Sequence, residues 1–99
     1  METDKQENNV PYNEVINFKQ ALYIDTDEED GLIENYLMTA KDYINGAVGD
    51  DVEDFQHDQR YNFAVQMLAQ FWYQNRGIDM QNTPYQVVSM IQQLRGEYD

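Results

Sequence analysis

Apolar residues recur along this chain at the three- and four-residue spacing that is typical of amphipathic helices. The spacing occurs in four segments, 13–23, 28–45, 58–76 and 83–96, and none of them shows the two-residue alternation of a strand. We therefore expect an all-α fold, a small bundle of about four helices.

The first two segments have recognisable helix ends. Asn13 is placed to cap the first helix. Thr26 and Glu29 have the spacing of a capping box before the second helix, and Asn45-Gly46 is a typical helix stop. The apolar stripes are Val15, Phe18 and Leu22 in the first segment, and Leu32, Ile33, Tyr36, Leu37, Ala40, Tyr43 and Ile44 in the second.

The third segment is apolar around most of its circumference. Asp58 can cap it and Gly77 can end it. Such a pattern indicates a central helix that is buried on nearly all sides. Because a short chain has little else with which to cover it, we expect part of this helix to be buried between subunits. Its polar positions form one narrow stripe of Asn62, Gln66, Gln70 and Gln74.

The last segment has a capping signal and a stop signal. Thr83 is the expected N-cap, with Pro84 at the first helical position, and Gly96 is the expected stop. The predicted core face is Tyr85, Val88, Ile91 and Leu94.

The two longest stretches outside these helices are the N-terminal residues and the segment after Gly46. Residues 1–12 are polar and without periodicity, so we interpret them as a flexible leader to a single domain at 13–99. An acidic loop follows Gly46, in which Val52 and Phe55 are expected to anchor the backbone.

The charge is large and unevenly placed. The chain has 99 residues and a formal net charge of −13. Residues 1–58 hold 16 acids and three lysines, whereas residues 59–99 hold three acids and three arginines. This balance argues against tight binding to a phosphate backbone or to an anionic membrane surface.

Candidate chemistry is sparse. The chain has no cysteine and one histidine, His57, in the acidic loop. We therefore expect no catalytic residues, metal site or cofactor, and no enzymatic activity. The absence of cysteine, of an apolar membrane span and of a signal-like start predicts a protein of the reducing cytoplasm. The many aromatic residues, 13% of the chain, are typical of cores and interfaces.

Three blocks resemble a known family: "LYIDTDEEDGLIENYLMTAKDYI", "RYNFAVQMLAQFWYQNR" and "TPYQVVSMIQQLRG". They are similar to the head–tail connector, or head-completion, proteins of long-tailed phages. The most similar branch is named for the tetrapeptide that here is Gln93-Leu94-Arg95-Gly96 and is associated with DNA packaging. The resemblance covers roughly residues 15–96, and Gln86 departs from it where the family often has glycine.

The resemblance implies a structural role in the virion neck. Such connectors form an oligomeric ring below the portal, through which duplex DNA passes without tight binding and to which the tail or a stopper attaches. The implied partners are copies of the chain itself, the portal protein and a tail or stopper protein. The chain would assemble in the host cytoplasm, from a phage or prophage gene.

These considerations give two sets of candidate site residues. Aromatic and arginine residues in the neutral half are expected at subunit or partner interfaces: Tyr73, Arg76, Tyr85 and Arg95. Acids from the charged half are expected to face the lumen, where they would keep DNA from adhering: Asp27, Glu28, Glu29, Asp30, Asp50 and Asp51.

Two other functions fit the same composition. An acidic DNA-mimic inhibitor of a nucleic-acid-binding enzyme would also be small and strongly negative. A generic helical interaction domain is the third interpretation, and it would not bind a portal. The oligomeric state of the purified chain distinguishes the connector from the mimic.

Overall fold

A computed structural model describes residues 10–49, 52, 54–76 and 83–98. These residues form four helices and no strand, so the predicted all-α fold is confirmed. The helices are α1 (Tyr12–Ala21), α2 (Asp30–Val48), α3 (Gln59–Gln74) and α4 (Tyr85–Tyr98).

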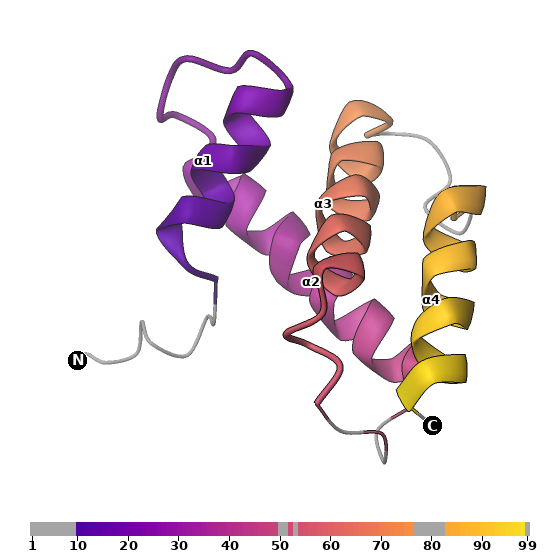
Figure 1. The fold of residues 1–99 in the computed structure, drawn as a ribbon. Coiled ribbons are helices and arrows are strands. Elements are labelled where there is room, and N and C mark those ends of the chain that lie inside the picture. Colours follow the sequence, from indigo (N-terminus) through magenta and orange to yellow (C-terminus); the bar gives the residue numbers. More distant parts are fainter. Residues whose placement is uncertain (1–9, 50–51, 53, 77–82, 99) are drawn as a thin grey trace.

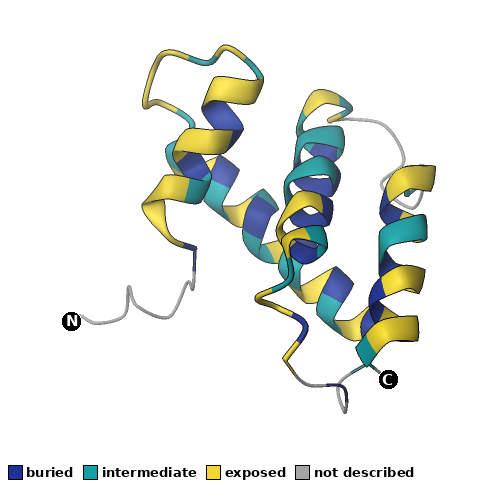
Figure 2. Cartoon of the chain, viewed as in Figure 1, coloured by how far each residue is buried: buried dark blue, intermediate teal, exposed yellow. Residues whose placement is uncertain are grey.

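Helix α2 forms the base on which the other three helices pack (Figure 1). Helix α3 lies between α1 and α4, and α4 runs antiparallel to it (Figure 1). Each helix turns one apolar face inward, and the faces meet in one continuous core (Figure 2). The largest fully buried side chains are Phe18, Phe55, Ile33, Leu37, Ile44, Leu68 and Leu94.

Helix α1 begins one residue earlier than expected and also ends earlier. Pro11, not Asn13, occupies the N-cap position, and its carbonyl accepts from the amide of Glu14 at 2.9 Å. The helix stops before Tyr23, which has a left-handed φ of 59°. Residues 1–9 of the expected leader lie outside the described residues, and Val10 is buried against the core.

Helix α2 differs from its predicted bounds at both ends. It begins at Asp30 with Glu29 at the N-cap position, so the capping box at Thr26 is wrong. It also continues through Asn45-Gly46 to Val48 and ends at Gly49, whose φ is 131°. An interior glycine costs about 1 kcal/mol relative to alanine. Burial of Val48 is worth about 1.5–3 kcal/mol, which explains why the extra turn forms.

Helix α3 has the predicted N-cap. The Asp58 carboxylate accepts from the amide of Arg60 at 2.9 Å, as an N-cap side chain should. Val52 and Phe55, in the loop before it, are both buried, which confirms that they anchor this loop. The helix ends at Gln74, with Asn75 as its C-cap, and the predicted stop at Gly77 lies outside the described residues.

Helix α4 is rotated relative to the predicted face. Its buried residues are Val87, Ile91 and Leu94, whereas Tyr85 is 79% exposed. Thr83 is not the cap, because the carbonyl of Pro84 accepts from the amides of Val87 and Val88. The predicted stop at Gly96 is also wrong, since the helix continues to Tyr98.

Candidate functional site

The two predicted interface residues at the end of α3, Tyr73 and Arg76, lie together, and a predicted lumen acid joins them. The Tyr73 hydroxyl donates a hydrogen bond to the Glu29 carboxylate at the start of α2. The Arg76 guanidinium lies 4.4 Å from the centroid of the Tyr73 ring and 3.6 Å from Glu29 Oε2. The hydrogen bond to the Glu29 carboxylate, with burial, raises the pKa of Tyr73. This Tyr73–Glu29–Arg76 cluster therefore fixes the end of α3 against α2.

The other two predicted interface residues lie on the outer face of α4. Tyr85 and Arg95 are both exposed, and Val88 and Gln92 lie between them on the same stripe. These four positions are spaced i, i+3, i+7 and i+10, which places them on one side of a helix. The structure therefore divides the four predicted interface residues between two places in the bundle.

The predicted lumen acids are also divided. Lys19, on α1, donates to Asp27 Oδ1 at 2.7 Å and to Asp30 Oδ1 at 2.8 Å. These hydrogen bonds raise the pKa of Lys19 above its ordinary value. Glu28, between the two aspartates, is exposed, whereas Asp50 and Asp51 lie outside the described residues. Lys19 therefore compensates part of the charge that this segment would present to a lumen.

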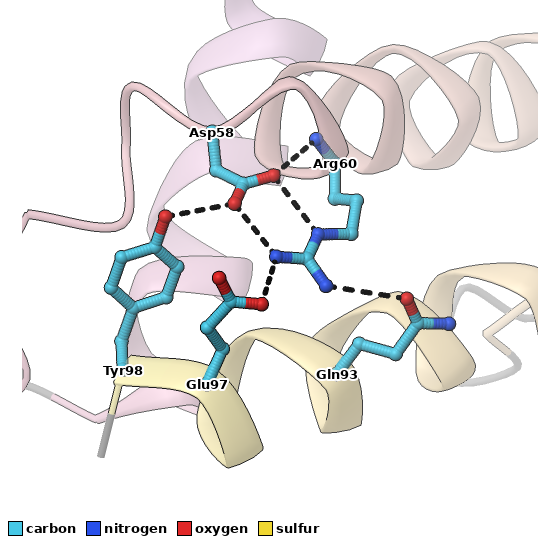
Figure 3. Close-up of polar contacts among 5 residues, drawn as sticks. All are labelled: Asp58, Arg60, Gln93, Glu97 and Tyr98. Carbon is cyan, nitrogen blue, oxygen red and sulfur yellow. Dashed lines mark hydrogen bonds and ion pairs between the residues drawn. The ribbon is translucent and has the colours of Figure 1, made fainter.

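A second polar cluster joins the start of α3 to the end of α4 (Figure 3). The Asp58 carboxylate accepts from the Arg60 guanidinium at 2.8 Å and from the Tyr98 hydroxyl at 2.8 Å. The Arg60 guanidinium also donates to Glu97 Oε1 at 2.7 Å. Hydrogen bonds from Arg60 hold the pKa of Asp58 well below its usual range. The Asp58 carboxylate in turn raises the pKa of Tyr98.

This Asp58–Arg60–Tyr98 cluster was not predicted as a site. The sequence indicates Asp58 as a helix cap. The position of Arg60 two residues later, within reach of the same carboxylate, was the one local sign that the two side chains could pair. Tyr98 and Glu97 gave no local signal, since 40 and 37 residues separate them from their partners. The cluster therefore ties the chain's last described turn to the beginning of α3.

One side of α3 is open, in contrast to the prediction that this helix is buried on nearly all sides. It packs mainly against α2 and α4, whereas Phe63 is 52% exposed. Phe63 lies on a groove of about 400 Å³ between α1 and α3. The groove is lined by Asn17, Ala21, Phe63, Gln66, Met67 and Gln70. Sequence reasoning missed this groove because the apolar pattern of α3 does not show which of its sides the bundle covers.

The titratable side chains in the described part of the chain do not gather into a metal site. No group of three or more histidine, aspartate or glutamate side chains among them could hold a metal ion. His57 is exposed, and its ring meets the edge of Tyr98 at a centroid distance of 6.1 Å. A polar hollow of about 670 Å³ has Glu14 and Lys41 on its wall, and these two form an ion pair at 3.0 Å. No helix within the described ranges is long and apolar enough to cross a membrane.

The bundle, its paired polar clusters and its open apolar groove define a small helical structural protein. The family model described as "Phage gp6-like head-tail connector protein" matches residues 12–95. The chain therefore belongs to the phage gp6-like head–tail connector family, as the sequence resemblance predicted. Membership assigns it a structural connector role and a place in the virion neck. No curated protein and no solved structure matches the chain.

Proposed function

We propose that the chain forms an oligomeric ring below the portal of a phage or prophage, through which duplex DNA passes and to which a tail or stopper attaches. Family membership carries this proposal. Two features of the molecule support it: an exposed apolar groove between α1 and α3, and an exposed face on α4. A ring built head to tail needs two different surfaces on each subunit.

The division of charge is consistent with this arrangement. The acids are concentrated in residues 1–58, and the segments 61–75 and 80–94 carry no charge. Copies with a net charge of −13 repel one another, so they can approach closely only where acids are few. We therefore place the apolar subunit contacts on α3 and α4, and the acids at 27–30 and 50–51 away from these apolar contacts.

Native mass spectrometry of the purified chain, alone and mixed with its portal protein, tests the ring. We expect a closed oligomer of many copies, formed at the latest when the portal is present. A chain that stays monomeric or dimeric and ignores the portal would contradict the proposal. Capture of a nucleic-acid-binding enzyme by such a monomer would support the DNA-mimic interpretation instead.

We place the acids at 27–30 and 50–51 on the wall of the lumen. Duplex DNA carries one negative charge per about 1.7 Å of its axis, and a negative wall would keep it from adhering. Screening restricts the effect to about 8 Å at physiological salt, so only acids that line the passage contribute. Glu28 is the described acid best placed to act, because it is exposed and has no ion pair within the described ranges.

Charge removal tests this placement. The combined Glu28→Gln, Asp50→Asn and Asp51→Asn variant is expected to bind duplex DNA more tightly once assembled and to slow DNA ejection. The control is Asp42→Asn, which removes an exposed acid of α2 outside both segments. Unchanged DNA binding and ejection in the combined variant would contradict the lumen placement while leaving the ring proposal intact.

A further inference from the structure

We propose that the groove between α1 and α3 of one copy receives the outer face of α4, centred on Tyr85 and Val88, from the next copy. This inference rests on the proposed ring and names the two surfaces that would build it.

The groove has the character of an unfilled binding surface. Its exposed lining is mainly apolar, with Phe63 and Met67 contributed by α3. Ala21, on α1, is small and leaves room beside Phe63 for an incoming side chain. Phe63 is 52% exposed although Phe18 and Phe55 are fully buried, so the bundle itself has no partner for this ring. Large exposed apolar groups on a rim of polar residues mark interaction surfaces.

The outer face of α4 has a matching composition. Tyr85 is 79% exposed and lies opposite the core residues Val87 and Leu94, and Val88, 38% exposed, lies at the border between this face and the core. Arg95 completes this face, and no acid lies on its stripe of Tyr85, Val88, Gln92 and Arg95. Aromatic residues and arginine are enriched at interfaces, whereas aspartate and glutamate are depleted.

The positions of the two surfaces favour a second copy as the occupant. Helix α3 separates α1 from α4 (Figure 1), so the α4 face of a subunit cannot reach the groove of the same subunit. Each copy thus offers a groove on one side and an apolar face on the other. Repetition of one such contact produces a head-to-tail series, which closes into a ring when the rotation allows.

The charges favour the same occupant. Arg95 is exposed and has no ion pair within the described residues. The chain leaves α1 at Ala21, on the groove, and enters an acidic loop in which Asp25 is exposed. With α4 seated in the groove, Arg95 of one copy would approach this acidic loop of the next. A copy of this chain therefore supplies both the apolar contact and the opposite charge.

Disulfide trapping tests the contact without background, because the chain has no cysteine. We would prepare Gln70→Cys, at the groove, and Gln92→Cys, on the α4 face, which leave the apolar residues in place. The two variants are mixed, assembled with the portal and oxidised mildly. We expect covalent dimers at least tenfold more abundant in the mixture than in either variant alone. A control mixture replaces Gln92→Cys with Thr39→Cys, at an exposed position of α2.

Loss of contact provides a second readout. Val88→Gln changes the α4 face but not its core side, so we expect unchanged circular dichroism and self-association weakened about tenfold or more. Two results would overturn this interface and leave the proposed function standing. One is a ring that assembles with the portal but gives no selective dimer between the Gln70→Cys and Gln92→Cys variants. The other is unchanged self-association of the Val88→Gln variant. Failure of the wild-type chain to form any ring would overturn both.

Discussion

Two phenylalanines allow a matched test of how the bundle divides core from surface. Phe55 lies in the loop before α3, is 1% exposed and contacts Tyr61 edge-on at a centroid distance of 5.7 Å. Phe63, eight positions later, is 52% exposed. The same substitution to alanine therefore removes the same atoms from two opposite environments.

The expected costs differ severalfold. Phe55→Ala loses a fully buried ring and leaves a cavity, which costs about 3–5 kcal/mol in free energy of unfolding. Full burial of a phenylalanine side chain is worth about 1.5–3 kcal/mol, so a half-exposed ring that leaves no cavity contributes about 1 kcal/mol. A chain of this length has a total stability of about 5–15 kcal/mol, so Phe55→Ala removes a large share of it.

Urea unfolding followed by far-ultraviolet circular dichroism and by the fluorescence of Trp72 measures both costs. A loss of 1 kcal/mol lowers the melting temperature of a domain this size by about 4–8 °C, so thermal melts give an independent check. We expect Phe55→Ala to shift the midpoint far more than Phe63→Ala. Equal shifts, or a larger shift for Phe63→Ala, would refute the placement of the Phe55 side chain in the core and of the Phe63 side chain at the surface.

Three further predictions concern the polar clusters. The folded-state pKa of Asp58 lies below the ordinary aspartate value of about 4. The ionised Asp58 carboxylate therefore stabilises the fold fully above about pH 4, and this contribution to the free energy of unfolding is lost as the pH falls below about 4. Wild type should therefore resist urea better than Asp58→Asn at pH 7, and the difference should begin to shrink below about pH 4 and continue to shrink as the pH falls toward the depressed folded-state pKa. Glu29→Gln should lower the pKa of Tyr73 toward about 10. Absorbance titration, with the Tyr73→Phe variant used to identify the Tyr73 signal, measures this pKa. An unchanged Tyr73 pKa would contradict the hydrogen bond between Tyr73 and Glu29. Lys19→Met should lower the melting temperature. The difference from wild type should shrink as salt is added, because salt screens both the lost attraction and the remaining repulsion between Asp27 and Asp30. A difference that does not depend on salt would argue against the ion pairs.

The helical fold could be predicted from the sequence because each helix has a continuous apolar stripe at helical spacing. The third segment shows this best, since its cap at Asp58 and most of its length are as expected. The helix ends were less predictable. Gly46 and Gly96 are stop signals in isolation, but both are inside helices here. Val48 gains burial from the added turn of α2, and Tyr98 gains a hydrogen bond to Asp58 from the added turn of α4.

The candidate surfaces were only partly predictable. Tyr85 and Arg95 were expected at interfaces and both are exposed, although Tyr85 was also expected on the core face of the last helix. Tyr73 and Arg76, also expected at interfaces, contact Glu29 within the chain, and Arg76 is exposed as well. The α1–α3 groove depends on how far α1 covers α3, which is set by tertiary packing around Phe18 and not by any local pattern.

Cryo-electron microscopy of the chain reconstituted with its portal protein tests the central claim most directly. The account predicts a closed ring stacked below the portal, with α3 and α4 at the subunit contacts and a continuous passage through the centre. Portal particles without added density, or with the chain bound as isolated subunits that do not touch one another, would contradict it.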